Sequence, residues 1–583
     1  MPSRRQFLAC ASAPLLASAQ QATRPPNVIL ILTDDQGWWD VGANGNRSVE
    51  TPSMDRLASE GVNYTRLYAS PVCAPTRASL MTGRYYLRTG IYNTRFGGDT
   101  LDAREITLAE LLRGRGYRTG LFGKWHLGHY RRYHPDLRGF DRFLGFTQGH
   151  VERYFHPDQL LDNGRHVRAR GHLTDLFTDS AIDFVRENRP RPFFLYLAYN
   201  VPHSPNYVEN RWTERYLKKG VPLEDAQIYG MLSHCDENIG RLMRTVDEGG
   251  LRHDTVVIFL SDNGGVSRHF RAGWRGGKGS AFEGGIRVPC FVRWPGHVAA
   301  GSTDSSMRAA MDLFPTILET AGAAPPKDRP IDGRSLFAPA PARSLFHIWD
   351  RHRPSAKSNW SVTRERFKLA GRELFDLEAD PGEKRDLSAT HPELAAEMRQ
   401  EFDRWLAEVT RGRSFHPLPV EVGRSDENPV ELLPSWASLR GTHVTWPSPG
   451  GTPSRPEPLP SVRSDDSAAN YSFAGYDWDT IDGWRSAGDS AEWKIDVVRA
   501  GRYRVRLAYG CPQHAAGGRW RLQAGAASLE GTVSSTGGRN VFREFDAGEV
   551  ALAKGAALIR MAVAESRSQE LMALNRICLD RIA

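Results

Sequence analysis

Four short apolar runs, each followed closely by polar residues, constrain the fold of this chain more than any other feature. The first, Asn27–Leu32, reads NVILIL, and a near-continuous apolar run of this length is typical of a central strand covered on both faces. Similar runs occupy Thr119–Phe122, Pro192–Tyr199 and Thr255–Leu260, with helical patterns between them. Strands that alternate with helices indicate an α/β layered domain with a mostly parallel central sheet.

Polar side chains of a consistent kind follow these runs. A single Asp or His after a strand is often only a turn former or a helix cap. In an open parallel sheet, however, ligands bind just outside the carboxyl ends of the strands. The residues that four strand ends bring to this edge are Asp34, Asp35, Lys124, His126, His203, Asp262 and Asn263. We expect them to form one site.

Part of this set has the chemistry of a metal site. Its members with side-chain oxygen ligands suit a hard cation such as Ca²⁺ better than zinc. They are Asp34, Asp35, Asp262 and Asn263. A cation held there would neutralise an anionic ester and orient the group that attacks it.

A further signal is the motif Cys73-Ala-Pro-Thr-Arg77, which continues as ASLMTGR. A lone cysteine is more often a small buried hydrophobic residue than a catalyst. The segment from Pro75 to Thr82 reads as a short helix that Gly83 stops, and its N-terminus, a favourable place for an anion, points at residue 73. Arg77 lies one helical turn further on the same face. The motif resembles the signature of the type I sulfatases, which belong to the alkaline phosphatase-like superfamily.

This resemblance implies a particular nucleophile. In type I sulfatases the cysteine is oxidised before folding to Cα-formylglycine (3-oxoalanine), and the hydrated aldehyde attacks sulfur. Cys73 would then need a separate formylglycine-generating enzyme as a partner. It would also be a further ligand of Ca²⁺, beside the four oxygen donors.

The resemblance extends to Lys278, which lies in the segment RGGKGSAFEGGIRVP, residues 275–289. Glycines on either side of this lysine would let the backbone approach a ligand closely. Lys278 and His203 would contact the sulfate, and His203, with an ordinary pKa, would protonate the departing alcohol.

The remaining roles also follow from the resemblance. Arg77 would hold the hydrated aldehyde and a sulfate oxygen, while Asp262 helps to activate the attacking hydroxyl. His126, with Lys124 nearby, would deprotonate the second hydroxyl so that sulfate is expelled. These roles explain why lysine, arginine and histidine accompany the carboxylates.

The 583 residues exceed what one hydrophobic core usually organises. Residues 23–330 form the predicted catalytic domain, and 331–410 a small α+β C-terminal subdomain with a helix over Pro392–Leu406. Residues 411–465 are rich in Pro, Ser, Gly and Arg, which predicts a linker. In residues 466–583, period-two alternation between Gly-rich turns predicts a β-sandwich. It is similar to the jelly-roll modules of secreted carbohydrate-active enzymes.

Residues 1–22 have the pattern of an export signal. Arg4 and Arg5 precede Phe-Leu and a short apolar stretch with an A-x-A-like end, which resembles the twin-arginine signal of proteins exported folded. We therefore expect a periplasmic or secreted protein. No run approaches the roughly eighteen apolar residues of a membrane helix, so no membrane span is predicted. Cys511 and Cys578 could form a disulfide or remain free buried thiols.

The formal net charge of +8 is a mild excess for this length. It suits an anionic substrate, and no basic stripe or tail typical of nucleic-acid binding is present. Three loops carry Arg, His and aromatic residues that could hold a sugar or aryl group: Tyr130–His134, His150–His156 and Arg268–Trp274.

Together these features predict a Ca²⁺-dependent sulfuric ester hydrolase that acts on an organic sulfate monoester, with a sulfated carbohydrate favoured over a small aryl sulfate. Two alternatives remain. Relatives with the same cysteine motif act on phosphorus, so the chain could be a phosphomonoester or phosphonate monoester hydrolase. It could also be a catalytically inactive glycan-binding protein, although the complete set of motifs argues against inactivity.

Overall fold

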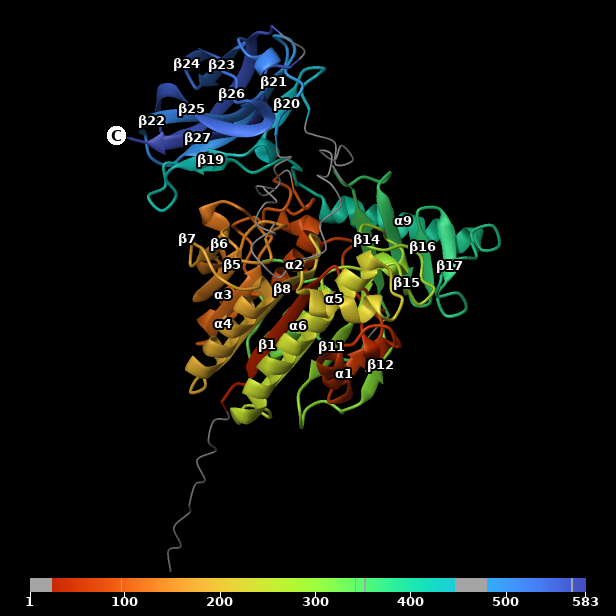
Figure 1. The fold of residues 1–583 in the computed structure, drawn as a ribbon. Helices are drawn as coiled ribbons and strands as arrows, with labels where there is room; N and C mark the ends of the chain where they lie inside the picture. The colour runs from red at the N-terminus through yellow and green to blue at the C-terminus, as the bar shows by residue number, and fades with distance from the viewer. Residues whose placement is uncertain are drawn as a thin grey trace, which may run out of the picture.

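A computed structural model describes residues 24–582, apart from residues 96, 152, 341, 351–352, 446–479 and 568–569. The predicted export signal therefore lies outside the described residues. An α/β domain, a small α+β subdomain and a pair of C-terminal sheets follow one another along the chain (Figure 1).

The α/β domain is built on one large, mostly parallel sheet. Its strands are β1 (Asn27–Asp34), β2 (Val62–Tyr64), β4 (Arg118–Lys124), β5 (Arg142–Phe146), β6 (Leu160–Asp162), β7 (Arg165–Val167), β8 (Phe193–Pro202), β9 (Thr255–Ser261), β11 (Cys290–Arg293) and β12 (Ser302–Asp304). Their order in space is β12-β2-β11-β9-β1-β8-β4-β5-β6-β7. In the middle, β1 pairs in parallel with β8 and β9, and β4 with β8 and β5. The predicted α/β fold is confirmed.

Helices cover both faces of this sheet. They are α1 (Pro52–Ser59), α2 (Cys73–Thr82), α3 (Leu108–Gly114), α4 (Leu173–Glu187), α5 (Asn210–Leu217), α6 (Leu223–Glu248) and α8 (Leu313–Thr320). The side chains of β1 alternate between two cores: Ile29 and Ile31 pack with α1, α4 and α6, whereas Val28 and Leu30 pack with α2, α3 and α8. All four are fully buried, as a strand covered on both faces requires.

The subdomain is an antiparallel sheet that carries one long helix. Its elements are β14 (Ser344–Trp349), β15 (Asn359–Arg364), β16 (Phe367–Ala370), β17 (Glu373–Asp376) and α9 (Pro392–Val409), and it adjoins α7 (Glu283–Ile286) and the small sheet of β3 (Leu67–Tyr68), β10 (Arg287–Val288) and β13 (Arg308–Ala309). Trp360 stacks on Phe402 of α9 with ring centroids 4.1 Å apart. The buried Lys368 amine lies 3.1 Å from Glu283 and 2.8 Å from Glu383, and this ion cluster fixes the subdomain to the α/β domain.

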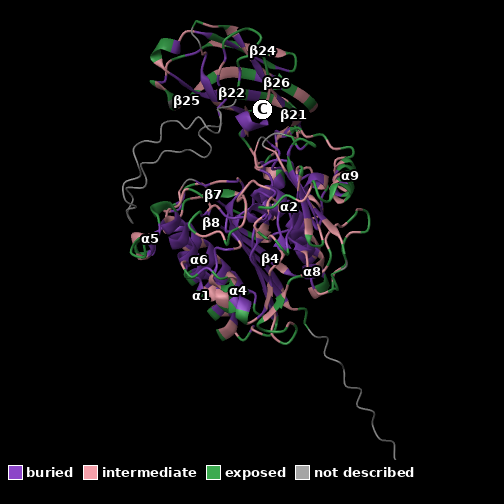
Figure 2. Ribbon diagram, turned by 90° about the vertical axis from the view of Figure 1, so that its right-hand side faces the viewer, coloured by how far each residue is buried: buried purple, intermediate pink, exposed green. Residues whose placement is uncertain are grey.

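The C-terminal sheets enclose a core of their own and form a β-sandwich (Figure 2). One sheet contains β18 (Val420–Val422), β20 (Ser438–Arg440), β21 (Ser490–Val497), β23 (Arg519–Ala524), β24 (Ala527–Thr532) and β26 (Gly555–Glu565); the other contains β19 (Val430–Leu432), β22 (Gly501–Cys511), β25 (Gly538–Leu552) and β27 (Ala573–Arg581). Trp493 and Tyr503, from opposite sheets, are fully buried between them.

The predicted linker over residues 411–465 is wrong in its middle part. Strands β18, β19 and β20 lie within it and pair with β21, β27 and β21, respectively. Each is only three residues long, so no periodicity marks it, and its partner lies more than fifty residues further along the chain. The rest of the predicted linker, from residue 446, lies outside the described residues.

The sandwich docks on the loop that follows β4. Tyr130 and Tyr133 of the α/β domain belong to the apolar core of the sandwich, and the Tyr130 ring meets Trp436 edge-on with centroids 5.0 Å apart. The Tyr130 hydroxyl donates to the Glu431 carbonyl at 2.8 Å. Tyr130–His134 was expected to hold a sugar or aryl group; its tyrosines instead fill an interdomain contact, because a hydrophobic pocket on the sandwich covers them.

The cysteines of the described residues are free and buried: Cys73, Cys235, Cys290, Cys511 and Cys578. Of the two alternatives for Cys511 and Cys578, the structure has the free thiols. Among the helices that the structure describes, none is both long and apolar enough to cross a bilayer.

Replacing Tyr130 should loosen the sandwich. We expect Tyr130→Ala to cost about 3–5 kcal/mol of interface stability because it leaves a cavity against Trp436, and Tyr130→Phe only about 0.5–1.5 kcal/mol, the net worth of one hydrogen bond. Thermal unfolding and limited proteolysis between the domains measure both. Arg132→Ala is the matched control, because the exposed Arg132–Glu421 ion pair contributes about 0–1 kcal/mol. Equal losses in Tyr130→Ala and Arg132→Ala would contradict this docking.

Candidate active site

The carboxyl ends of β1, β4, β8 and β9 meet beside the N-terminus of α2, as the sequence predicts. The Lys124 amine donates to Asp34 at 2.6 Å, and both side chains are fully buried. The Arg77 guanidinium donates to Asp262 at 3.0 Å and to the Lys124 carbonyl at 2.7 Å. Residues from three strand ends and one helix therefore form a single buried charge network.

The pKa values of the two central carboxyls move in opposite directions. Burial raises the pKa of Asp34, but the charges of Lys124, His203 and Arg77 outweigh it and hold that pKa well below its usual range. Burial, with the neighbouring charge of Asp34, raises the pKa of Asp262 well above its usual value. Although Arg77 lies near both Asp34 and Asp262, the two carboxyls therefore do not titrate alike.

Asp35 forms a second, adjacent network. The Lys278 amine lies 2.7 Å from Asp35 Oδ1 and donates to Asp35 Oδ2 at 2.8 Å. The Asn263 amide donates to Asp35 Oδ1 at 2.9 Å. Asp35 has a φ of +70°, in the left-handed region that non-glycine residues rarely adopt. Strain of this kind costs roughly 1–3 kcal/mol and is concentrated at functional sites.

The oxygen donors fit the hard cation that the sequence predicts. Within the described residues, the buried oxygens Asp34 Oδ1 and Asn263 Oδ1 have no hydrogen-bond partner, and such orphaned acceptors are rare in folded proteins. Two groups of donors each converge within 4.8 Å: Asp34 with Asp35 and His203, and Asp34 with Cys73 and Asp262. The carboxylate-rich donor set is the type that Ca²⁺ prefers.

Cys73 is the first residue of α2 and is almost fully buried. The helix begins there without a side-chain cap on its N-terminus, which leaves its first N–H groups directed toward the donor cluster. The expected helix over residues 75–82 is present and ends at Gly83 in the left-handed conformation.

His126 is buried on the loop after β4, again with a left-handed backbone, at a φ of +58°. Its Nε2 atom lies 2.9 Å from the Thr94 carbonyl and 3.7 Å from the Asp99 carboxylate. Burial, with the charge of Lys124, lowers the pKa of His126 to about 3. Neither Thr94 nor Asp99 was predicted, because the segment that carries them matches none of the motifs.

His203 lies 3.9 Å from Asp35, but the prediction of an ordinary pKa for it is wrong. Burial, with the charge of Lys278, lowers its pKa to about 4, so the imidazole is neutral near pH 7. The ring of His150 packs against it with centroids 5.6 Å apart. His150 was expected only as part of a sugar-holding loop.

Asn200, at the end of β8, was missed although it directly follows the apolar run. Both atoms of its side-chain amide are buried without a partner in the described part of the chain.

The glycines around Lys278 approach protein backbone. A Cβ on Gly264 would lie 2.0 Å from the Gly284 carbonyl, and one on Gly285 would lie 2.1 Å from the Ser280 carbonyl. The Lys278 amide donates to the Gly265 carbonyl at 3.2 Å. The glycine-rich segment therefore packs against the loop after β9 and carries the lysine to Asp35.

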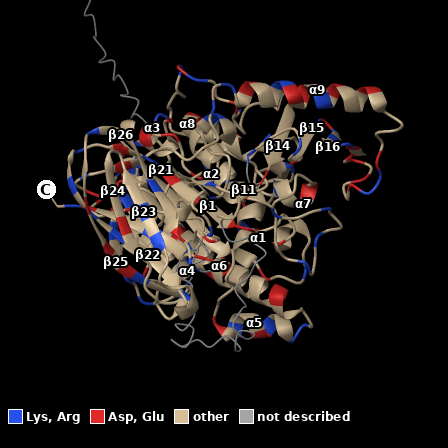
Figure 3. Ribbon diagram, turned by 90° about the horizontal axis from the view of Figure 1, so that it is seen from above, with Lys and Arg blue, Asp and Glu red and all other residues tan. Residues whose placement is uncertain are grey.

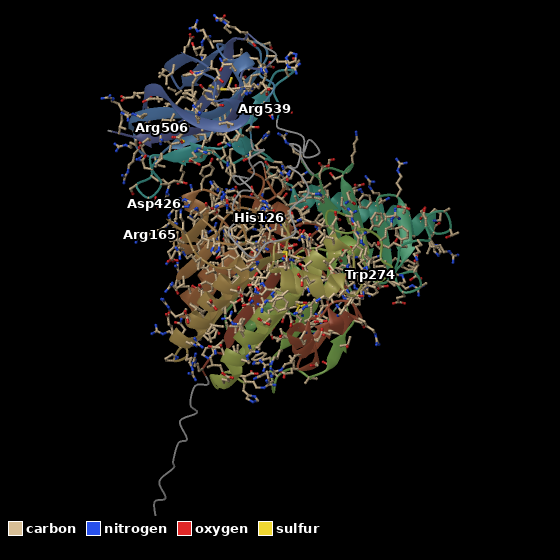
Figure 4. The ribbon with its side chains drawn as sticks, in the orientation of Figure 1. His126, Arg165, Trp274, Asp426, Arg506 and Arg539 are labelled. Carbon is tan, nitrogen blue, oxygen red and sulfur yellow. The ribbon has the colours of Figure 1, made fainter. Side chains whose placement is uncertain are left out.

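Trp274, from the third loop expected to hold a sugar, packs on Trp38 with ring centroids 4.5 Å apart. The Arg287 guanidinium lies 4.5 Å from the Trp274 ring. Figure 4 shows His126 centrally beneath the sandwich and Trp274 on the side of the subdomain.

Comparison with known proteins agrees with this geometry. A profile of the Sulfatase family matches residues 26–323, and one described as N-sulphoglucosamine sulphohydrolase, C-terminal, matches residues 273–410. N-acetylgalactosamine-6-sulfatase of Mus musculus is 36% identical over 359 residues, covering 55% of this chain and 67% of that protein. Arylsulfatase A of Homo sapiens is 32% identical over 490 residues, covering 70% and 93%.

A solved structure is similar to about two thirds of this chain. Ps i-CgsB, in complex with k-i-k-neocarrahexaose, shares 30% sequence identity and a TM-score of 0.63, covering 67% of this chain and 95% of that one. The chain therefore belongs to the sulfatase family, within the alkaline phosphatase-like superfamily. The protein is a sulfatase, as predicted.

Removing the buried lysine should destabilise the α/β domain. Lys124→Met leaves Asp34 charged and buried with one partner fewer, which typically costs about 3–5 kcal/mol; denaturant-induced unfolding measures it. Lys278→Met is the matched comparison and should cost less, because the Lys278 side chain is 25% exposed and water can replace it. A larger loss for Lys278→Met than for Lys124→Met would be inconsistent with the pairing described here.

Proposed function

We propose that this sulfatase hydrolyses sulfate monoesters of carbohydrates through a hydrated formylglycine at residue 73 and Ca²⁺. The observation that carries the proposal is the convergence of Cys73 with Asp34 and Asp262 within 4.8 Å, beside orphaned oxygens on Asp34 and Asn263. A sulfate ester needs its charge neutralised before a nucleophile can approach. The oxygen donors would hold the cation that neutralises this charge, and residue 73 would supply the nucleophile.

Carbohydrate is the substrate class that the relatives support. The matched curated relatives include N-acetylgalactosamine-6-sulfatase, and Ps i-CgsB is complexed with an oligosaccharide. Those names describe other proteins; their similarity to this chain, with the β-sandwich docked close to the site, favours a sulfated glycan over a small aryl sulfate.

The hydrated aldehyde would supply two hydroxyl groups, one to attack sulfur and one whose deprotonation expels sulfate. Arg77, whose guanidinium is fully buried, holds Asp262 in place to accept a hydrogen bond from the attacking hydroxyl. His126, oriented by the Thr94 carbonyl and with Lys124 beside it, would take up the second proton once the negative charge of the bound ester raises its lowered pKa.

Lys278 and His203 serve the other end of the ester. Each lies within 4 Å of Asp35, so both would reach a sulfate that contacts the cation and residue 73 together. His203 would gain its proton when the anionic ester enters, since a nearby negative charge raises the pKa of an imidazole. It would then pass that proton to the departing alcohol.

A bound Ca²⁺ would polarise the sulfate oxygens and neutralise their charge. Its ligands would be the side-chain oxygens of Asp34, Asp35, Asp262 and Asn263, with residue 73. We also propose that the protein is exported through the twin-arginine-like segment and that a formylglycine-generating enzyme modifies it beforehand, since a protein exported folded must be modified before it leaves.

Sulfate release and the state of residue 73 test the proposed function together. Active protein should release sulfate from members of a panel of defined sulfated saccharides and leave matched phosphate esters largely unchanged. Its tryptic peptide Leu67–Arg77 should carry an aldehyde by mass analysis. Cys73→Ala should lose at least about a thousand-fold in rate, as loss of a nucleophile does, while Cys235→Ala, a buried control, keeps its activity. Fully active protein with only a thiol at residue 73 would falsify the proposed nucleophile.

The cation can be tested by stability alone. Ca²⁺ at a hundred times its dissociation constant should add about 2.7 kcal/mol to the free energy of unfolding, and a chelator should remove it. Asn263→Leu should abolish or sharply weaken this increment. Asn238→Leu, a buried control on α6, should lower the stability but keep the Ca²⁺ response. If Zn²⁺ stabilises the protein and Ca²⁺ does not, the assignment of the cation is incorrect.

A further inference from the structure

A cavity of about 520 Å³ lies where the three parts of the molecule meet. Its walls come from Tyr92 and Asn93 of the α/β domain, from Arg353 and the Phe415–Pro417 segment near the subdomain, and from β20 and β21 of the sandwich. We call it the junction cavity. Its volume is in the range of small-ligand sites, about 300–1,000 Å³.

Basic side chains from separate parts of the chain line the junction cavity. The Arg353 guanidinium donates to His416 Nδ1 at 2.9 Å, and Arg440 pairs with Glu492 at 2.7 Å. The Lys494 side chain on β21 is exposed and makes no ion pair or hydrogen bond with any residue that the structure describes. Arg353, His416 and Lys494 all line the cavity, and burial, together with the charges of Arg353 and Lys494, lowers the pKa of His416.

Basic side chains elsewhere on the sandwich, on the opposite sheet and on the far edge of the same sheet, have the ion-pair partners that Lys494 lacks. Acidic and basic side chains alternate there across β22–β25 (Figure 3), and Arg506 pairs with Glu544 and Arg521 with Glu530, each at 2.6 Å. A cation left without a carboxylate partner in a concave, mixed-polarity surface is suited to an anionic ligand.

The other chemical feature of the junction cavity is aromatic. The rings of Tyr92 and Phe415 lie with centroids 5.5 Å apart, and Leu558, which is 40% exposed, completes an apolar wall. Aromatic rings beside polar groups suit ligands that have one apolar face and one hydrated edge. A sugar ring, with its C–H face and its hydroxyl edges, is such a ligand.

One chain segment joins the junction cavity to the active site. Tyr92 and Asn93 line the cavity, while the carbonyl of Thr94, the next residue, lies 2.9 Å from His126. Neighbouring Cα atoms are about 3.8 Å apart, so the wall of the cavity and the backbone that orients His126 are separated by a single peptide unit. The segment is held in place because Gly97, with a φ of +66°, packs tightly on Pro417.

We propose that the junction cavity binds a second, anionic sugar unit of the same glycan chain whose sulfate ester is hydrolysed at residue 73. The inference rests on the proposed carbohydrate function and extends it: the substrate is an oligosaccharide or polysaccharide with more than one acidic unit. Lys494 and Arg353 contact the anionic group, and Tyr92 and Phe415 support the ring. Binding at two linked points makes the second contact intramolecular and so favours long chains over single sugars.

The test compares substrates of increasing length on the full-length protein. Sulfate release is measured from one small aryl sulfate and from sulfated oligosaccharides ranging from disaccharide to hexasaccharide, with wild type, Lys494→Glu and Phe415→Ala. We expect Lys494→Glu to raise KM for the longer chains by about ten-fold or more, the worth of one charge-assisted contact, and Phe415→Ala to raise it because the sugar ring loses its aromatic support. Turnover of the aryl sulfate stays within about two-fold of wild type, since neither residue touches the reacting group. Lys554→Glu, an exposed lysine of the sandwich outside the cavity, is the matched control and leaves every substrate unaffected.

The outcomes separate this inference from the proposed function. If wild type acts on the oligosaccharides and Lys494→Glu and Phe415→Ala match it at every length, the junction cavity is not a sugar subsite and the carbohydrate function stands. If a variant loses activity equally on the aryl sulfate, its effect is not on chain binding and the inference also fails. If wild type cleaves the aryl sulfate but no saccharide, the proposed substrate class is incorrect and the inference is overturned with it.

Discussion

The ion pair between Asp34 and Lys124 is the interaction on which the rest of the site depends. Both side chains are fully buried and 2.6 Å apart, and they come from strands that lie on either side of β8. Removing two charges from water costs several kcal/mol for each ion unless the partners are close and well bonded. The pair therefore fixes the relative positions of β1 and β4, and Arg77, which bonds to Asp262 and the Lys124 carbonyl, ties in α2 and β9.

Much of this arrangement could be predicted from the sequence because it follows from strand ends. Apolar runs such as Asn27–Leu32 reveal buried strands, and parallel strands present their carboxyl ends at one edge, so Asp34, Lys124 and Asp262 had to lie near one another. The left-handed backbone at Asp35 and His126 could not be predicted, because Asp and His adopt it more often than most residues but only where the surrounding packing imposes it. The lowered pKa of His203 was missed for a related reason: burial is a tertiary property.

The boundary of the sandwich was mispredicted because its first strands have no pattern of their own. Three-residue strands such as Val420–Val422 are defined by their partners, and a Pro- and Gly-rich context gives no indication of them. Tyr130 shows the same limit. An aromatic residue on a loop near an active site favours a ligand contact by composition, but here its ring completes the core of another domain. In both cases the deciding partner is distant in sequence.

The position of β27 has a consequence for how the molecule is made. This strand, Ala573–Arg581, is the last element that the structure describes, yet it lies between β19 and β22 in its sheet and is hydrogen-bonded on both sides. On the ribosome, β19 and β22 emerge long before β27 and cannot be bridged until β27 has been synthesised. The sandwich is thus completed only after β27 has emerged, and its apolar contact surface for Tyr130 forms after the α/β domain has had time to fold. Order of synthesis and order of assembly therefore run in the same direction, with the catalytic half first.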